Sequence, residues 1–281
     1  MLKVFFVLLY LMVAALQANE NLIVKGNKPS YLSSVTTDFA NVKAVSDAAF
    51  VPDLELGFIP QGIEKFKKDI LITGYDKKYY KCTVYKINKE NKVTKQQVIS
   101  GCKHAGAISL MGEEKLVVSD TKNLFILDTK NFKTLQKIPL KGKVRGSFIT
   151  NDGKFWFIGV YAKDVDKSFI YKFTDEQLQN SNYLDENIAI QRIPIPLRAQ
   201  GADFDSFGNL WITTNRRNYG VLTKYNTNFQ VVDTYKTVRG LEDIDIRGKY
   251  MWIVSESGSK PYSNWPQVFP AYFKINLEML E

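Results

Sequence analysis

The amino-acid sequence predicts an all-β fold, a five-bladed β-propeller. Five stretches of the chain repeat one order of features, and they start roughly 40 to 55 residues apart, close to the length of a propeller blade. A sustained helical period is absent apart from one short turn beginning at Thr174. A β-sandwich with regular turns is the alternative, but it does not explain why the same order recurs five times.

Each repeat begins with a small, often glycine-containing segment, followed by a polar turn and a strongly apolar strand. A third strand with alternating buried and polar positions comes next. The five starting segments are 61–63, 104–108, 145–148, 200–204 and 241–244. The apolar second strands are expected at 70–73, 116–119, 155–158, 210–213 and 251–254. The third strands are expected at 83–87, 124–127, 169–173, 221–225 and 271–275.

A fourth strand follows in the first four repeats, at 93–99, 135–140, 190–195 and 230–235, but the fifth repeat has none before Glu281. A strand from the other end of the chain can complete the last sheet of a closed ring and remove its open edge. We therefore expect the segment 19–56 to supply the closing strand, at 42–48 or 22–24, and 57–281 to form the five-repeat propeller.

Residues 1–18 have the pattern of an export signal. Lys3 precedes an apolar run at 4–16, and small or neutral residues lead to Ala18. The run is about 13 residues, shorter than the roughly 20 of a membrane-spanning helix, although an uncleaved anchor is the alternative. We expect a secreted or periplasmic monomer with no membrane span after cleavage.

Cys82 and Cys102 are the two cysteines of the sequence. In an exported protein an even number of cysteines favours a disulfide bond, and two free buried thiols are the alternative. The formal net charge of +9 comes with scattered lysines and without a recognition motif, so nucleic-acid binding is not expected.

The starting segments of the innermost strands meet around the central channel of a propeller, so their polar residues are the candidates for a ligand site. The ends of the second strands add further candidates: Tyr75, Asp76, Asp120, Tyr161, Asn215, Arg216 and Glu256. The predicted ligand-binding residues are Gln61, His104, Arg145, Gln200, Asn215, Glu242 and Glu256. The ligand would be a small molecule or an extracytoplasmic protein, with the aromatic loop around Tyr262 and Trp265 as a further contact.

His104 is the one histidine in the sequence, and it is the candidate for a catalytic base or a metal ligand. The alternative is a rim residue whose hydrogen bonds hold its loop. A single histidine with both cysteines in a disulfide cannot build a typical zinc site.

The segment 205–211, Asp-Ser-Phe-Gly-Asn-Leu-Trp, resembles the tight turn of lactonase-like and NHL-type propellers. The whole repeat set resembles a group of bacterial exported propeller-like proteins of unassigned function. The motifs that carry this likeness are Pro60-Gln61-Gly62-Ile63, His104-Ala105-Gly106, Gln200-Gly201-Ala202 and Glu256-Ser257-Gly258. The chain departs from the pattern at Arg145-Gly146, and the resemblance implies a fold without assigning a catalytic residue.

Lactonase-like propellers hold calcium in the channel with oxygen ligands, so the resemblance implies a second hypothesis, a calcium-dependent lactonase or esterase-type hydrolase. Its candidate ligands are Asp203, Asn215, Glu242 and Asp243. The alternative for these residues is hydrogen bonding to backbone amides. Whether the protein is an enzyme stays open at the level of sequence.

Overall fold

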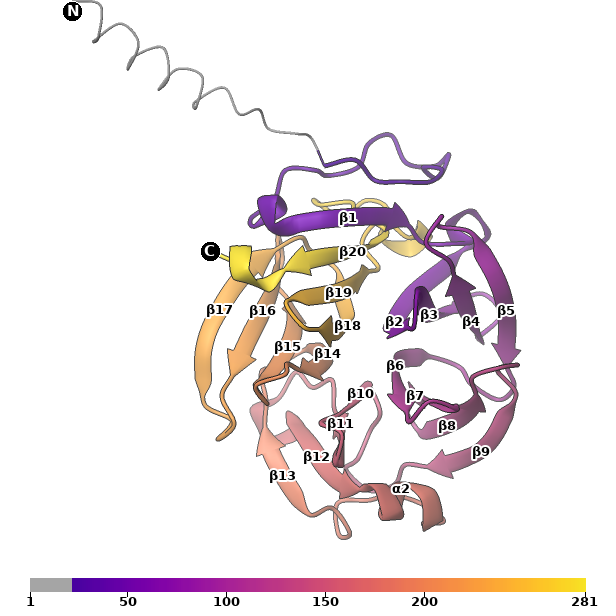
Figure 1. Ribbon diagram of the computed structural model, residues 1–281, viewed down its shortest axis with the longest axis vertical. Helices are drawn as coiled ribbons and strands as arrows, with labels where there is room; N and C mark the ends of the chain where they lie inside the picture. Colours follow the sequence, from indigo (N-terminus) through magenta and orange to yellow (C-terminus); the bar gives the residue numbers. More distant parts are fainter. Residues whose placement is uncertain (1–21) are drawn as a thin grey trace, which may run out of the picture.

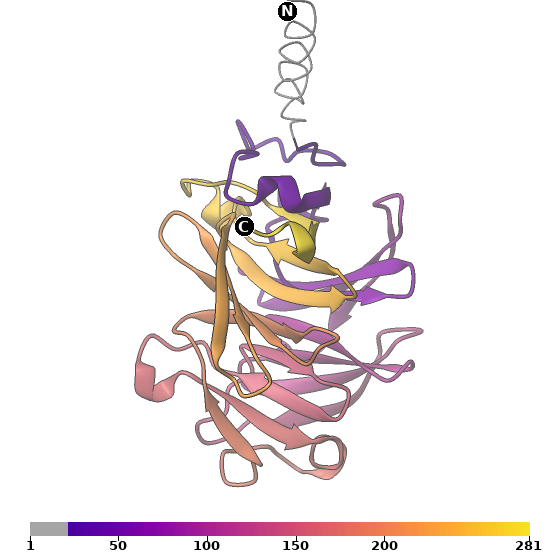
Figure 2. The ribbon, with the colours of Figure 1, turned by 60° about the vertical axis from the view of Figure 1, so that its left-hand side comes forward.

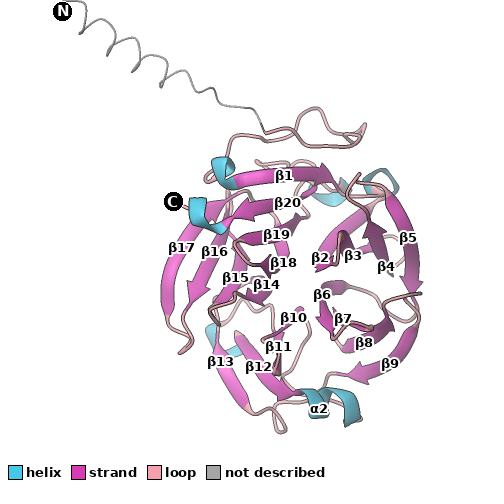
Figure 3. Cartoon of the chain, in the orientation of Figure 1, coloured by secondary structure: helices cyan, strands magenta, loops and turns pink. Residues whose placement is uncertain are grey.

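A computed structural model describes residues 22–281, so the predicted export signal lies outside the described residues. The strands form five antiparallel sheets of four strands each, arranged as blades around one axis. Figure 1 looks down this axis and shows the ring, and Figure 3 shows that the short helical segments lie at its periphery. The prediction of an all-β, five-bladed propeller is confirmed.

The blades follow the chain in order. Blade 1 consists of β2 (Phe58–Phe66), β3 (Asp69–Asp76), β4 (Lys81–Ile87) and β5 (Val93–Ile99). Blade 2 consists of β6 (Ala105–Met111), β7 (Lys115–Asp120), β8 (Asn123–Asp128) and β9 (Thr134–Pro139). Blade 3 consists of β10 (Phe148–Asn151), β11 (Phe155–Gly159), β12 (Phe169–Thr174) and β13 (Gln191–Pro194). Blade 4 consists of β14 (Ala199–Phe204), β15 (Leu210–Asn215), β16 (Gly220–Tyr225) and β17 (Val231–Thr237).

Blade 5 joins the two ends of the described chain. Its order is β18 (Leu241–Arg247), β19 (Tyr250–Ser255), β20 (Ala271–Asn276) and then the N-terminal β1 (Val45–Phe50). β1 runs antiparallel to β20, with Ala48 opposite Phe273. Figure 2 shows β1 and the C-terminus side by side at one edge of the ring. The predicted N-terminal closing strand is therefore confirmed.

The closing strand begins later than the predicted 42–48. Val42–Ala44 form a 3-10 turn, η1, because Ala44 N–H donates to the carbonyl of Asn41 before the chain becomes extended at Val45. The other predicted segment, 22–24, is not a strand. Its neighbour Lys25 makes an isolated parallel bridge with Ala49, so this segment lies along the outer edge of β1.

The apolar second strands supply the core between neighbouring blades. The second strands β11 and β15 are buried along almost their whole length. Phe157 of blade 3 packs on Phe204 of blade 4 with ring centroids 4.7 Å apart, and Trp211 of blade 4 lies in one apolar cluster with Met251 of blade 5. The blades thus stabilise one another through shared apolar surface.

The long third repeat contains the one α-helix of the described chain, α2 (Asp175–Asn180). Thr174 caps it: the side chain accepts from Gln177 N–H, and the Gln177 side chain accepts from Thr174 N–H. This confirms the helical turn predicted at Thr174. The rest of the insertion reaches blade 2, where Leu184 forms a parallel bridge with Leu140.

The remaining short segments are 3-10 turns in connecting loops. They are η2 (Leu54–Leu56), η3 (Val165–Lys167), η4 (Lys260–Tyr262) and η5 (Leu277–Met279). Within residues 22–281, no helix is long and apolar enough to span a membrane.

The Asp205–Trp211 segment forms the tight turn that its motif predicts, between β14 and β15. The Asp205 carboxylate accepts from the backbone of Phe207 and Asn209 and from the indole N–H of Trp211. Gly208 has a φ of 78°, which suits glycine. The motif thus has a structural role here.

Cys82 and Cys102 form a disulfide bond, as predicted, with their Cα atoms 5.6 Å apart. Cys82 lies in β4 of blade 1, and Cys102 lies in the loop that leads to β6 of blade 2. Both residues are buried. The bond therefore fixes the loop that carries His104 to the neighbouring blade.

Candidate functional site

β-Bulges near the starts of the innermost strands turn polar side chains toward the channel. The pairing register shifts between Pro60 and Gly62 in β2, between Ala199 and Gly201 in β14, and between Leu241 and Ile244 in β18. A bulge redirects the side chain of the extra residue. The residues at these shifts include Gln61, Gln200 and Glu242, three of the predicted ligand-binding residues.

The glycines next to two of these bulges allow the innermost strands of adjacent blades to approach closely. A Cβ atom on Gly201 would lie 2.5 Å from the Cα of Asp243 in the next blade. A Cβ atom on Gly62 would lie 2.9 Å from the backbone carbon of Ala107. Larger residues would push the strands apart, so the Gln-Gly pairs of the sequence serve both the packing and the channel.

One cavity of about 680 Å³ opens at the end of the channel where the innermost strands begin, and we call it the mouth cavity. Side chains from all five blades line it. Six of the seven predicted ligand-binding residues are among them: Gln61, His104, Gln200, Asn215, Glu242 and Glu256. The structure thus brings together residues that lie up to 195 positions apart in sequence.

Two glutamate side chains form the floor of the mouth cavity. Glu242 and Glu256 are 2% and 7% exposed, and their carboxyl groups lie close enough to shift each other's pKa. Gln61 Nε2 donates to Glu256 Oε2 over 3.0 Å, and Gln200 Nε2 donates to Glu242 Oε1 over 3.0 Å. An amide from blade 1 and another from blade 4 therefore hold the pair in place.

Burial changes the protonation of this carboxyl pair. It raises the pKa of Glu256 to about 7. Burial, together with the charge of Glu256, raises the pKa of Glu242 well above its ordinary value. Two buried carboxyl groups beside each other cannot both be charged cheaply, so the pair holds at least one proton at neutral pH. The floor accordingly carries at most one negative charge.

Aromatic rings form the wall above the floor. Tyr75 packs on His104 with ring centroids 4.3 Å apart, and Tyr262 packs on Trp265 at 4.4 Å. Both Tyr75 and Tyr262 line the mouth cavity, and burial raises the pKa of the Tyr262 hydroxyl to about 12. Tyr262 and Trp265 come from the aromatic loop that the sequence singles out.

His104 lines the mouth cavity and is half-buried. Burial lowers the pKa of its imidazole, so the ring is neutral at neutral pH. Its buried Nδ1 atom has no hydrogen-bond partner within residues 22–281. The arrangement gives His104 a free polar atom, and a catalytic role for it stays a prediction.

Four arginines, which we call the rim arginines, surround the opening: Arg198, Arg216, Arg217 and Arg239. The first three are exposed, and their guanidinium groups make no ion pair in the described part of the chain. Arg239 is half-buried and stacks over Trp265, 3.9 Å from the ring centroid. Its buried Nε atom has no hydrogen-bond partner among the described residues.

Three rim arginines, Arg198, Arg217 and Arg239, are not among the predicted site residues. Arg145 is predicted to bind the ligand, but it lies outside the cavity. Arg145 turns back on its own loop, where its guanidinium donates to the carbonyl groups of Gly142 and Val144. It does not line the mouth cavity. Arg198 and Arg239 stand two and three positions before Gln200 and Glu242. Their positions just before β14 and β18 are the sequence feature from which these two arginines could have been predicted.

The four predicted calcium ligands do not share one centre. Asp203 accepts from Thr150 and Ile246 N–H, and Asp243 accepts from the backbone of Ile63 and Ile108. Asn215 accepts from Gly240 and Leu241 and so braces a loop. Across residues 22–281, no three His, Cys, Asp or Glu side chains are placed to hold a metal ion. The observed hydrogen bonds favour the alternative role of bonding backbone amides, and a calcium site at these residues stays a prediction.

The geometry of the innermost strands explains why the four predicted calcium ligands make separate contacts. Asp203 lies three residues beyond Gln200 in β14, about 10 Å further from the mouth. Asp243 follows Glu242, and its side chain accepts from backbone amides of blades 1 and 2, at Ile63 and Ile108. Acidic residues far down the channel thus bond backbone amides, the alternative that the sequence left open.

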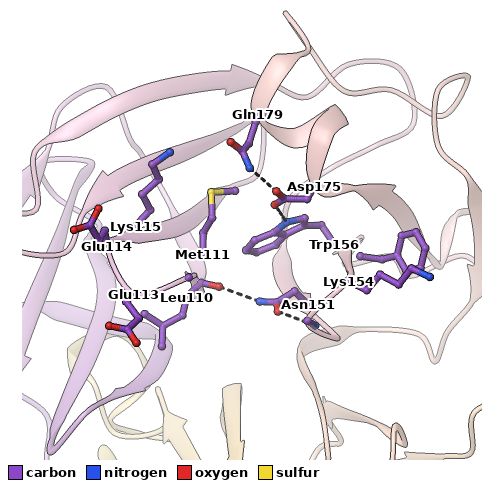
Figure 4. A pocket seen from close by; sticks show the side chains of 13 residues that line it. Leu110, Met111, Glu113, Glu114, Lys115, Asn151, Lys154, Trp156, Asp175 and Gln179 are labelled. Carbon is purple, nitrogen blue, oxygen red and sulfur yellow. Dashed lines mark hydrogen bonds between the residues drawn. The ribbon is translucent and has the colours of Figure 1, made fainter.

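A second cavity of about 600 Å³ lies between blades 2 and 3, at the opposite ends of their strands. Figure 4 shows hydrogen bonds among some of its polar side chains. Asp175 accepts from the indole N–H of Trp156 and from Gln179, and Asn151 donates to the carbonyl of Leu110. The groups at its centre are thus paired, while charged side chains such as Glu113, Lys115 and Lys154 make no hydrogen bond or ion pair in the described part of the chain.

Comparisons with known proteins support the fold and assign no function. No family model and no curated protein matches the sequence. Among solved structures, Myxococcus xanthus glutaminyl cyclase is similar with a TM-score of 0.58 at 7% identity, covering 82% of this chain and 94% of that one. A Bacteroides caccae protein of unknown function has a TM-score of 0.49 at 11% identity, covering 79% of each chain.

A third structure, Kuenenia stuttgartiensis hydrazine synthase, matches with a TM-score of 0.42 at 12% identity over 70% of this chain. The match spans 55% of the hydrazine synthase chain. Identities this low show a shared fold alone. The chain is thus structurally similar to known β-propeller proteins, and a sequence family is not shown.

Proposed function

We propose that this protein is an extracytoplasmic binding protein that holds a small polar ligand in the mouth cavity. One observation carries the proposal: all five blades contribute polar side chains to a single cavity, and several of these groups lack a partner. The His104 Nδ1 and Arg239 Nε atoms are buried without a hydrogen bond within residues 22–281. Buried polar atoms are costly unless they are paired, so a ligand with matching groups would bind here favourably.

The proposed compartment rests on the disulfide and on the N-terminal sequence. A buried disulfide between Cys82 and Cys102 is typical of proteins that fold in an oxidising compartment. Residues 1–18 have the composition of an export signal. Both features support a secreted or periplasmic location.

The arrangement favours binding over calcium-dependent hydrolysis. The hydrolase hypothesis needs Asp203, Asn215, Glu242 and Asp243 around one ion, and their oxygen atoms are directed to different protein groups. The activity named for the M. xanthus enzyme is not carried over, since a chain 7% identical shares the fold alone.

A thermal-shift screen tests the proposal with amino acids, short peptides, sugars, uronic acids and nucleotides as probes. A ligand present at about 100 times its Kd stabilises the folded protein by about 2.7 kcal/mol. We expect at least one probe class to raise the Tm, and Gln200→Ala and Trp265→Ala to remove that shift. Gln179→Ala, in the second cavity, is the matched control and should keep it.

Two outcomes would contradict the proposal. In the first, none of the probe classes raises the Tm of the unmodified protein. In the second, the shift survives both mouth-cavity substitutions and is lost in Gln179→Ala, which would place the ligand between blades 2 and 3.

A further inference from the structure

We infer that the ligand of the mouth cavity is a zwitterion of the amino-acid or short-peptide class, with its ammonium group at the glutamate floor and its carboxylate group at the rim arginines. This inference rests on the proposed function and specifies the chemistry of the same site. It follows from the opposite charges at the two ends of the cavity.

The floor is rich in hydrogen-bond acceptors. Gln61 and Gln200 direct their amide donors at Glu256 and Glu242. No hydrogen bond within residues 22–281 reaches the carbonyl Oε1 atom of either glutamine. These two carbonyl oxygens are therefore free to accept, and they lie beside the buried carboxyl pair. An ammonium group, with three donors and a positive charge, matches them.

The rim is rich in donors and carries positive charge. Arg198, Arg216 and Arg217 make no ion pair in the part of the chain that the structure describes. Arg239 is held over Trp265 with its Nε atom unpaired. A guanidinium group fixed in this way binds a carboxylate through two parallel hydrogen bonds. The rim is therefore complementary to an anionic group.

Ligands that lack one or both of these opposite charges fit the cavity less well. A dianion that reached the floor would meet the buried carboxyl groups of Glu242 and Glu256, which offer it no opposite charge. A simple amine would satisfy the floor and leave the arginines at the opening unpaired. A neutral sugar would leave both charged ends without an opposite charge. A zwitterion satisfies both ends at once.

Isothermal titration calorimetry on the full protein tests the inference with free amino acids and with trialanine, trilysine and triphenylalanine. The tightest binder is then compared with its N-acetylated form and its C-amidated form. We expect each cap to weaken binding by at least about tenfold, since each removes one charge that the cavity pairs.

Two substitutions assign the two ends of the ligand. Glu256→Gln keeps the shape of the floor. It should reduce the loss of binding affinity that N-acetylation of the ligand causes. Arg217→Glu reverses an exposed rim charge. It should reduce the loss of binding affinity that C-amidation of the ligand causes. Lys163→Glu, an exposed residue outside the mouth cavity, is the matched control and should change neither.

Equal affinity for the capped and free forms overturns the inference. So does a panel in which no amino acid or tripeptide binds. Either result leaves the proposed function standing if sugars, uronic acids or nucleotides bind the mouth cavity, so the two failures are distinguishable.

Discussion

Gln61 and Glu256 are 195 positions apart in sequence, and the side-chain amide of one donates to the carboxyl group of the other over 3.0 Å. Gln61 belongs to the first blade, and Glu256 follows the second strand of the last. The same amide also donates to the carbonyl of Pro60. This contact therefore links the first and last blades at the floor of the mouth cavity.

Replacing Gln61 with leucine removes the donor and leaves a buried acceptor unpaired. We expect the free energy of unfolding to fall by about 1 to 3 kcal/mol, measured by urea denaturation. Gln97→Leu, at an exposed position of β5, is the matched control and should change stability by less than about 0.5 kcal/mol. Equal stability of the two variants would show that the contact does not hold the ring.

The carboxyl pair makes stability depend on pH. The pKa of Glu256 rises from 4.5 to about 7 on folding, so the folded protein holds this proton more tightly than the unfolded chain. The resulting stabilisation is complete below about pH 4.5 and is lost as the pH rises through 7. The pKa of Asp203 is likewise raised to about 7 by burial, so it adds to the same trend. We expect a lower Tm at pH 8 than at pH 5.

Glu256→Gln should remove part of this dependence, on the order of 3 kcal/mol between the two pH values. The groups that face Glu256 are Glu242, Gln61 and Arg239, and the substitution leaves them in place. Differential scanning calorimetry at pH 5 and pH 8 measures the effect. An unchanged difference in Tm would mean that Glu256 does not carry the extra proton.

Reduction of the disulfide should destabilise the protein. The bond between Cys82 and Cys102 closes a loop with a sequence separation of 20, and its loss costs about 3 kcal/mol in the chain-entropy treatment. We expect the double substitution to serine to lower the urea midpoint and to release the loop that carries His104. Hydrogen exchange at residues 102–106 measures that release, and exchange as slow as in the oxidised protein would contradict it.

The closing strand should be required for folding. Ala48 of β1 is 2% exposed and lies in the apolar cluster of blade 5. Ala48→Asp buries a charge there and should lower stability by several kcal/mol or prevent folding. Ser46→Asp, at an exposed position of the same strand, should be tolerated. Circular dichroism and size-exclusion chromatography measure both variants, and equal behaviour would mean that β1 does not close the ring.

The ring could be predicted from sequence because its order of features recurs in every blade. Trp156 and Trp211 occupy equivalent second strands, and the polar turns before them fix where each strand begins. The start of the closing strand could not be predicted, because the left-handed conformation of Asn41 and the turn at Val42–Ala44 arise from contacts with the chain's other end. Tertiary contacts decide such boundaries.

The candidate site could be predicted in part, for a similar reason. Gln61, Gln200 and Glu242 occupy corresponding positions in their blades, so the repeat places them together. Blade 3 has Ser147 at this position, and Ser147 lines the mouth cavity. Arg145 stands two residues earlier, and its guanidinium donates to the carbonyl groups of Gly142 and Val144. The direction of a long side chain depends on such local acceptors, which the repeat pattern does not record.

The affinity of a probe identified by thermal shift, measured by calorimetry, tests the central claim most directly. Three proteins are compared: the unmodified chain, Glu242→Gln in the mouth cavity, and Lys154→Glu in the second cavity. The account predicts that Glu242→Gln weakens binding by at least about tenfold and that Lys154→Glu leaves it unchanged. Loss of binding in Lys154→Glu with full affinity in Glu242→Gln would contradict it.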